Sequence, residues 1–322
     1  MDRSVRPPLA NDLFDSRFDR VLRSFQNELV PILHRLRSLP PNRSLEQVLQ
    51  ELQQDAERYP KRLEQLMAAR FYLQHVLHTC GNQWAALADQ ATNFVALFDT
   101  LAEWQHHTKE EVAVVTFNYD LMVEHALATV LGMQFNKTRD WMTGNGIRLF
   151  KLHGSVNWAH PARITGVHGA SRVSDLVRAA GSRALVIDDQ VFEMTTEVTP
   201  TSGSEVTQIP ALAIPVVSKK GFECPSDHLA ELINVLPTVT RILVIGWRAT
   251  ETDFVRLWKE LVPPAQVIRT FVVAEDRDAA AVTVENLKAA GLTPASTAAI
   301  GDGFTGLVQG TVVRDLLRAK PD

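Results

Sequence analysis

Two polar side chains follow short apolar runs of the sequence, where a sheet could present them to a ligand. Asn118 comes after the run 112–116 (Val-Ala-Val-Val-Thr), and His153 comes after the run 148–152 (Arg-Leu-Phe-Lys-Leu). An imidazole transfers protons near neutral pH, and an amide both donates and accepts hydrogen bonds. Because polar groups directly after buried strands rarely serve the core alone, we treat Asn118 and His153 as candidate site residues.

Both runs belong to a part of the chain in which short β-branched runs alternate with helical segments. Strands are predicted at 112–116, 148–152, 184–187, 212–217, 241–245 and 267–273, and helices at 121–131, 226–236, 252–261 and 279–290. Such alternation implies parallel pairing and a doubly wound sheet, whose ligands lie beyond the carboxyl ends of the strands. We therefore expect Asn118, His153 and Gly246 at one edge of this sheet.

The N-terminal third has a different pattern. From residue 11 to about residue 105, apolar residues recur at helical spacing, which predicts three to five helices. We assign 1–110 to a helical region and 111–322 to an α/β region, with both forming one domain. The Gly-, Ser- and Thr-rich segments 166–181 and 195–208 are expected to be surface loops or a small insertion.

Composition limits the function classes. The chain has 322 residues, of which 45% are hydrophobic and 22% charged, as in globular proteins with a substantial core. Its net charge of −4 argues against a broad surface for nucleic acid or membranes. Cys80 and Cys224 are its two cysteines, which are too few for a disulfide framework or a four-cysteine zinc site. No apolar stretch has the length of a membrane span, so we expect a cytosolic protein.

The candidate residues lie in segments that resemble motifs of the sirtuin superfamily. Segment 116–120 (Thr-Phe-Asn-Tyr-Asp) resembles its Thr-x-Asn-x-Asp motif, and 151–155 (Lys-Leu-His-Gly-Ser) resembles its Leu-His-Gly motif. Segment 242–246 (Ile-Leu-Val-Ile-Gly) resembles the strand and glycine facing the adenine ribose, and 271–275 resembles the next nucleotide-facing strand. The chain resembles bacterial SIR2-like proteins, many of which act in antiphage defence, more than protein deacylases, because it combines Asn-Tyr-Asp, a preceding helical region and no four-cysteine zinc module.

The resemblance implies a Rossmann-like fold and cleavage of the bond between nicotinamide and ribose in NAD. Nicotinamide is a good leaving group, so such an enzyme mainly stabilises an oxocarbenium-like ribose and positions a nucleophile. His153 would act as a general base toward a ribose hydroxyl or water, and Asn118 would hold the ribose or that water. Tyr119 and Asp120 would hold the nicotinamide carboxamide, and Thr116 would support their loop.

The same resemblance assigns residues to the rest of NAD, which is a substrate here, with no metal expected. Gly154 and Ser155 complete the second motif and are predicted to contact NAD. Gly246 would allow close approach of the adenosine, and Glu275 or its neighbour would accept from the adenine-ribose hydroxyls. Trp247 is also assigned to the NAD-binding residues by its place after Gly246, although sirtuins favour a small hydroxyl residue there.

One motif of the family has no counterpart. The sheet normally begins with a strand that ends in a Gly-Ala-Gly-x-Ser loop, whose amides approach the pyrophosphate of NAD. Residues 1–14 instead resemble the segment just after that loop. Either the native chain begins upstream of Met1, which we favour because the later motifs are intact, or this is a degenerate member that binds NAD poorly.

Each functional assignment has a structural alternative. Asn118 could cap the following helix, with Asp120 as a favourable first-turn acid. A lone His-Gly after a strand is commonly a turn. Segment 275–278 (Glu-Asp-Arg-Asp) could be a solvated helix entry, and Trp247 is expected to be a packing residue.

Three function classes follow. The first is an NAD glycohydrolase that depletes NAD in antiphage defence, the second a non-catalytic nucleotide-binding or scaffold subunit, and the third an NAD-dependent protein deacylase, disfavoured by the missing zinc module. Because constitutive NAD loss would kill the host, we expect control by homo-oligomerisation or by a sensor protein of the defence system. Direct nucleic-acid or membrane binding is not expected.

Overall fold

The computed structural model describes residues 8, 12–38, 45–56, 58–88, 92–144, 146–166, 169–198, 200, 204–214, 221–263, 266, 268–291, 296–301 and 303–318. Within them the protein is mixed α/β, with small parallel and antiparallel sheets. Residues 1–11, on which the expectation about the Gly-rich loop depends, lie outside this description except for Pro8. Among the described residues, no helix has the length and apolar character needed to cross a bilayer.

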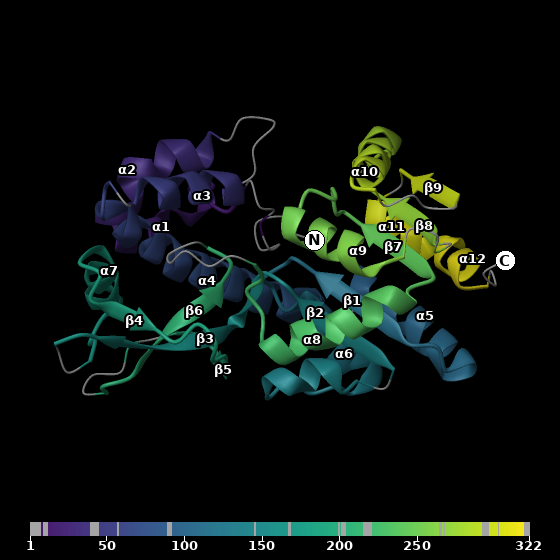
Figure 1. The fold of residues 1–322 in the computed structure, drawn as a ribbon, viewed down its shortest axis with the longest axis horizontal. Helices are drawn as coiled ribbons and strands as arrows, with labels where there is room; N and C mark the ends of the chain where they lie inside the picture. Colours follow the sequence, from purple (N-terminus) through teal and green to yellow (C-terminus); the bar gives the residue numbers. More distant parts are fainter. Residues whose placement is uncertain are drawn as a thin grey trace.

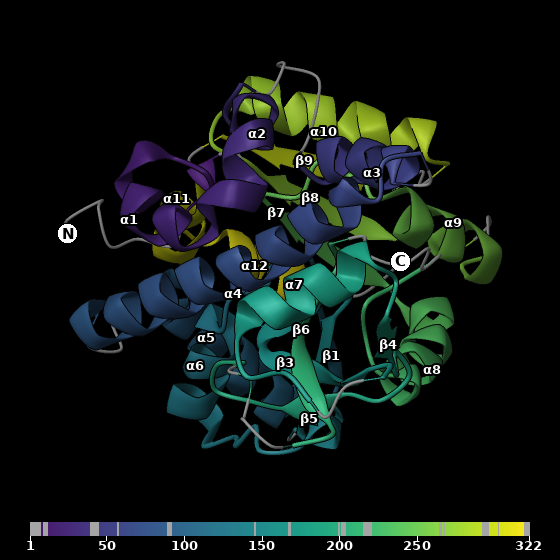
Figure 2. The same cartoon turned by 90° about the vertical axis from the view of Figure 1, so that its left-hand side faces the viewer.

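Helices fill the N-terminal third, as predicted. They are η2 (Ser16–Phe18), α1 (Asp19–Leu22), η3 (Arg23–Phe25), α2 (Gln26–Arg37), α3 (Leu45–Asp55), α4 (Lys61–Ala88) and α5 (Asn93–Thr108). The long helix α4 lies between α2 and α3 on one side and α7 (Val173–Gly181), β3 (Gly154–Ile164) and β6 (Thr207–Leu212) on the other (Figures 1 and 2).

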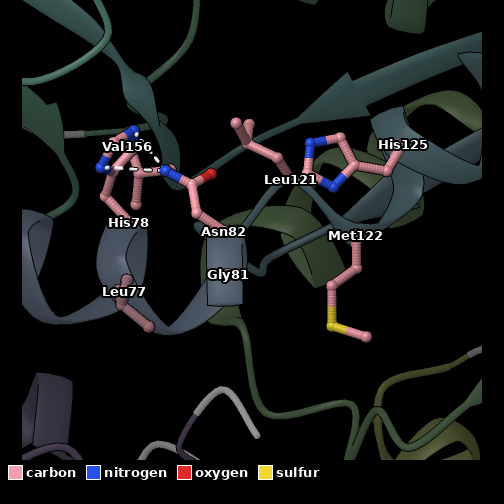
Figure 3. Close-up of a pocket in the computed structure, with 8 residues that line it drawn as sticks. All are labelled: Leu77, His78, Gly81, Asn82, Leu121, Met122, His125 and Val156. Carbon is pink, nitrogen blue, oxygen red and sulfur yellow. Dashed lines mark hydrogen bonds between the residues drawn. The ribbon is translucent and has the colours of Figure 1, made fainter. Parts of the chain in front are cut away.

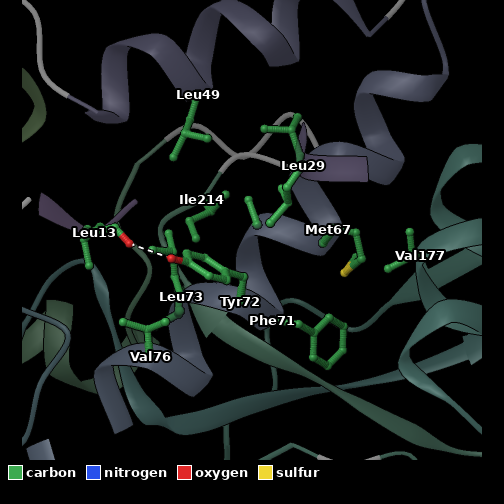
Figure 4. Close-up of a cluster of buried hydrophobic side chains, with 14 of the residues drawn as sticks. Leu13, Leu29, Leu49, Met67, Phe71, Tyr72, Leu73, Val76, Val177 and Ile214 are labelled. Carbon is green, nitrogen blue, oxygen red and sulfur yellow. Dashed lines mark hydrogen bonds between the residues drawn. The ribbon is translucent and has the colours of Figure 1, made fainter. Parts of the chain in front are cut away.

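The middle of α4 carries the core of this region. Met67 and Tyr72 are fully buried against Leu29 and Ile214, and the Tyr72 hydroxyl donates a hydrogen bond of 2.9 Å to the Leu13 carbonyl oxygen (Figure 4). Burial raises the pKa of the Tyr72 phenol well above its ordinary value. Because α4 packs on two sides, its apolar residues are not confined to one face. The sequence therefore predicted a helix here but gave no sign that it lies at the centre of this region.

The first parallel sheet joins β1 (Val112–Thr116) to β2 (Ile147–Lys151), in register from Val112 opposite Ile147 to Thr116 opposite Lys151. The strand predicted at 112–116 is confirmed, and that at 148–152 is confirmed with a shift of one residue. The connection contains α6 (Met122–Leu131) and η4 (Thr138–Met142), and α8 (Ser226–Val235) contacts β2 and η4.

A second parallel sheet has the order β7 (Arg241–Ile245), β8 (Arg269–Val273), β9 (Ser296–Ile300). Its helices are η5 (Leu236–Thr238), α9 (Thr252–Leu261), α10 (Arg277–Ala289), α11 (Gly303–Gln309) and α12 (Val312–Arg318). The predicted strand 241–245 and helix 252–261 are confirmed at both ends. In the part of the chain that the structure describes, the parallel strands form two separate sheets, not one continuous sheet.

Side-chain contacts join the two parallel sheets at both ends. Arg241, which begins β7, forms an ion pair of 2.7 Å with Glu110, just before β1. Phe117, just after β1, stacks on Trp247, just after β7, with 5.7 Å between ring centroids. The two strands therefore run in the same direction, and their carboxyl ends share one aromatic contact.

The sequence did not predict the antiparallel sheet. Strand β3 (Gly154–Ile164) pairs antiparallel with β4 (Leu185–Ile187), β5 (Glu193–Met194) and β6 (Thr207–Leu212). Parallel pairing of the run 184–187 was therefore wrong. Polar residues and a proline interrupt β3, so it lacks the β-branched run that marks a buried strand. Of the strand predicted at 212–217, residue 212 ends β6 and residues 215–217 lie outside the described residues.

One expected loop contains a helix. Within the segment 166–181, helix α7 (Val173–Gly181) packs against α4. Its Leu176 and Val177 are buried, and Asp175 accepts hydrogen bonds from the backbone amides of Ser171 and Arg172 at its start. The loop prediction was wrong for 173–181. The Gly and Ser residues on both sides of this short segment masked its amphipathic helical pattern.

Candidate functional site

Asn118 and His153 lie close together at the carboxyl edge of the first parallel sheet. The Leu152 amide donates to the Thr116 carbonyl oxygen at 3.1 Å, so pairing continues to the last residues before both motifs. The ring centroids of Phe117 and His153 are 5.0 Å apart, and those of Tyr119 and His153 are 6.3 Å apart. The structure thus brings both predicted motifs to one place, with Asn118 exposed and His153 half-buried.

Backbone contacts shape the loop that carries Asn118. The Asn118 amide donates to the Thr116 hydroxyl at 3.1 Å, so Thr116 does support this loop. The Asp120 carboxylate accepts from the amide of Met122, the first residue of α6, at 3.0 Å. The helix-start acceptor is therefore Asp120, and the alternative in which the Asn118 side chain makes this cap was wrong.

A buried ion pair lies beneath the same loop. Lys151 is fully buried, and its ammonium group donates to the Glu124 carboxylate at 2.9 Å. It also donates to the carbonyl oxygens of Tyr119, at 3.4 Å, and Asp120. Glu124 is buried and accepts from the Trp141 indole at 3.2 Å. Sequence reasoning missed this group, although a lysine inside the apolar run 148–152 was a signal, because lysine is almost never fully buried unpaired.

The backbone around His153 is held from two sides. The Ala213 amide donates to the His153 carbonyl oxygen, and the Glu223 amide donates to the Leu152 carbonyl oxygen, each at 2.9 Å. Gly154 has φ +86°, and a Cβ there would overlap the Ala211 carbonyl oxygen. Gly154 is therefore required by the backbone.

Ser155 is also buried, and its position differs from that expected of a ligand contact. Its hydroxyl donates to the Asn157 side-chain oxygen at 2.7 Å. The hydrogen bond is local to β3, so the structure gives Ser155 a role in the strand that follows His153.

Further buried polar groups lie near the start of β3. The Arg70 guanidinium, on α4, donates to the carbonyl oxygens of Pro210 and Ile214 at 3.1 and 2.5 Å. Burial lowers the pKa of Arg70, and the charges of Glu223 and Tyr119 act in the opposite direction. The Glu223 carboxylate contacts the His160 imidazole, whose Nδ1 donates to the Val191 carbonyl oxygen at 2.7 Å.

The residues predicted for the adenosine side lie at the carboxyl ends of β7 and β8. Gly246 is exposed with φ +65°, and its amide donates to the Val273 carbonyl oxygen at 2.9 Å. Trp247 is half-buried, stacks on Phe117, and donates its indole N–H to Glu251. Trp247 is therefore a packing residue, as predicted, and it links the two strand ends.

Glu275 is not brought to the Asn118–His153 pair by any hydrogen bond or ring contact found among the described residues. It is exposed, one residue before Asp276, whose carboxylate accepts from the Ala279 amide at 2.7 Å and caps α10. The alternative of a helix entry therefore describes 275–278.

A small cavity lies beside the start of α6, between this helix and the C-terminal half of α4 (Figure 3). Its volume is about 10 Å³, which is close to the space that one water molecule needs. Its lining residues are Leu77, His78, Gly81, Asn82, Leu121, Met122, His125 and Val156. The Asn82 amide lies 3.2 Å from Nε2 of His78, and burial lowers the pKa of this histidine. The cavity is next to the Asn118 loop but has no described contact with Asn118 itself.

No protein-family model matches the chain, and no curated protein matches it. Within the described parts of the chain, no group of three or more His, Cys, Asp or Glu side chains is placed to hold a metal ion.

Proposed function

We propose that this protein is an NAD glycohydrolase that cleaves NAD to nicotinamide and ADP-ribose. The observation that supports it best is the adjacency of the two motifs: Phe117 and Tyr119, on either side of Asn118, both contact the His153 ring. Asn118 and His153 are 35 positions apart in sequence, and parallel pairing of β1 with β2 carries them to one edge.

The proposed fold class is a Rossmann-like nucleotide-binding unit formed by both parallel sheets together. Supporting it, β1 and β7 run in the same direction and are joined at both ends by the Glu110–Arg241 and Phe117–Trp247 contacts. A nucleotide would lie beyond the carboxyl ends of these strands, with nicotinamide toward β1 and β2 and adenosine toward β7 and β8.

In the proposed reaction, water attacks the ribose carbon as its bond to nicotinamide breaks. Nicotinamide leaves with the bonding electron pair, the water oxygen bonds to the ribose, and a water proton passes to the His153 imidazole. Asn118 is exposed at the loop tip and would hold the ribose hydroxyl or the water through its amide. Tyr119 and Asp120 would border the nicotinamide, while Gly246 would face the adenosine.

A second candidate is a non-catalytic nucleotide-binding or scaffold subunit. The observation that favours it is the packing of Phe117, which contacts His153, Trp247 and Phe254 at once, with ring centroids 5.0 to 5.7 Å apart. These aromatic contacts occupy space between the two strand ends. In either function, we propose a role in antiphage defence, controlled by self-assembly or by a sensor protein.

Nicotinamide release from NAD distinguishes the two functions. We expect release by the wild-type protein and a loss of about 100-fold or more in His153→Ala and Asn118→Ala, with far-ultraviolet circular dichroism unchanged. The exposed His107 and Asn136 provide matched controls, because His107→Ala and Asn136→Ala remove the same side chains away from the site. NAD binding without release would favour the scaffold. Peptide-dependent formation of acyl-ADP-ribose would favour the deacylase.

A further inference from the structure

Lys151 makes contacts that connect the two motifs of the site. It is the last residue of β2, two positions before His153, and its ammonium group lies under the loop that follows β1. An ammonium group has three N–H donors. Here three acceptors are present: the Glu124 carboxylate and the carbonyl oxygens of Tyr119 and Asp120.

Removing the charges of Lys151 and Glu124 from water costs free energy, so a stabilising role alone does not explain this pair. Lys151 and the Glu124 side chain are 0% and 4% exposed, so both charges are removed from water. Buried ion pairs commonly contribute no more to stability than well-packed apolar residues of the same size. The contacts that an apolar residue could not make are those to the two loop carbonyl oxygens.

Those two contacts fix the backbone directly after Asn118. The Tyr119 carbonyl oxygen also accepts from the Val156 amide at 2.9 Å, and the Asn118 amide is held by Thr116. Holding the carbonyl oxygens of residues 119 and 120 orients both following peptide planes. Since His153 is carried by the strand that ends in Lys151, one side chain couples the Asn118 loop to the His153 strand.

We propose that Lys151, whose charge is balanced by Glu124, is a positioning residue that fixes the Asn118 loop relative to His153. The proposal rests on the proposed function, because it assigns the pair to the geometry of that reaction. Lys151 reaches the backbone and is assigned no contact with substrate. Its loss should misplace Asn118 and lower kcat more than it raises KM.

A double substitution tests this without leaving an unpaired buried charge. In Lys151→Met/Glu124→Gln both new side chains are uncharged and close in length to the originals, and the glutamine oxygen can still accept from Trp141. Arg148→Met is the matched control, because Arg148 lies on the same strand, forms ion pairs with Glu111 and Glu231, and contacts neither motif. We expect kcat to fall about 10- to 100-fold in the double variant and to stay within about twofold in the control.

Two further readouts separate positioning from a general structural effect. In an Asn118→Ala background, the double substitution should cause no additional loss of kcat, because the group it positions is gone. Amide hydrogen exchange at residues 117–122 should become about tenfold faster in the double variant and remain unchanged in Arg148→Met. The exchange experiment needs no substrate.

The outcomes distinguish this proposal from the proposed function. A wild-type protein that releases no nicotinamide contradicts the proposed function, and the exchange rates still decide whether Lys151 holds the loop. Unchanged amide exchange at residues 117–122 in the double variant overturns the proposal that Lys151 holds this loop. Normal kcat in the double variant of an active protein overturns the positioning role, even when exchange is faster.

Discussion

The two strand-end regions of this protein are built in different ways. At the carboxyl ends of β1 and β2, buried Lys151 pairs with Glu124 and holds carbonyl oxygens of the loop after Asn118, and buried Arg70 holds the carbonyl oxygens of Pro210 and Ile214. At the carboxyl ends of β7 and β8, Gly246 and Glu275 are exposed, and residues 246–251 and 274–276 connect the two strands to helices α9 and α10. In the first region buried polar side chains bind the backbone, whereas in the second the residues predicted to face a ligand are exposed and Trp247 packs through its aromatic ring.

This difference indicates that the backbone is more rigid at the carboxyl ends of β1 and β2 than at those of β7 and β8. Buried polar groups cost free energy unless they are hydrogen-bonded, and the three acceptors of the Lys151 ammonium group therefore specify the backbone of the loop after Asn118 strongly. In the proposed reaction, His153 and Asn118 must be placed within fractions of an ångström, whereas adenosine needs only a surface to lie on. We therefore expect substitutions in the first region to have larger effects.

Gly154→Ala should have the largest effect on stability. Gly154 has φ +86°, and an added Cβ would overlap the Ala211 carbonyl oxygen in the neighbouring strand. Because the overlap is with backbone, either β3 or β6 must shift, and we expect a loss of about 2–5 kcal/mol in the free energy of unfolding. Urea unfolding followed by circular dichroism measures it, and a loss below about 1 kcal/mol would show that this region is less rigid than described.

Trp247→Ala tests the connection between the two regions. The indole stacks on Phe117 and contacts Phe254, so its removal leaves a gap between the strand ends. Since Trp247 is only half-buried, we expect a loss of about 2 kcal/mol by the same unfolding experiment, and a smaller loss in Trp247→Phe, which keeps an aromatic ring. Equal losses in the two variants would contradict a role for ring stacking.

Gly246→Ala should cost less than Gly154→Ala, although both glycines have positive φ. A Cβ added to Gly246 meets no atom within 4 Å, so the cost is conformational only. We expect about 1–2 kcal/mol, measured alongside Gly154→Ala under the same conditions. If Gly246→Ala proved as destabilising as Gly154→Ala, the distinction between a rigid and an open region would be lost.

The smallest effect concerns pH. His228, on α8 against the first region, is fully buried, its Nε2 donates to the Thr138 carbonyl oxygen, and burial lowers its pKa. Below the ordinary histidine pKa, His228 binds a proton in the unfolded chain but stays neutral in the folded protein. The free energy of unfolding should therefore fall as the pH is lowered from about 6.5. The fall should be weaker in His228→Gln. Equal pH dependence in the two proteins would assign it to other groups.

Sequence patterns predicted those parts of the fold that have strong local periodicity. The strands at 112–116 and 241–245 and the helix at 252–261 were located at both ends, because a continuous apolar run or a clear helical face marks each. The adjacency of Asn118 and His153 followed from the geometry of parallel strands. Strand β3 and helix α7 were not predicted, because polar and small residues interrupt their patterns.

The supporting contacts of the site could not be predicted for a different reason. Lys151 and Glu124 are 27 positions apart, and their pairing depends on how the folded chain places the start of α6 beside the end of β2, which no local pattern encodes. The one sign of it was a charged residue within an apolar run. Trp247 was correctly expected to pack, but its partner Phe117 depends on how the two sheets face each other.

The central claim is that Asn118 and His153 form one site for NAD cleavage, and nicotinamide release by the double variant Asn118→Ala/His153→Ala tests it most directly. Residues that act as a unit show strongly non-additive losses. We predict that the double variant is no slower than the slower single variant. A double variant whose loss equals the product of the two single losses, or a wild-type protein that releases no nicotinamide, would contradict the account.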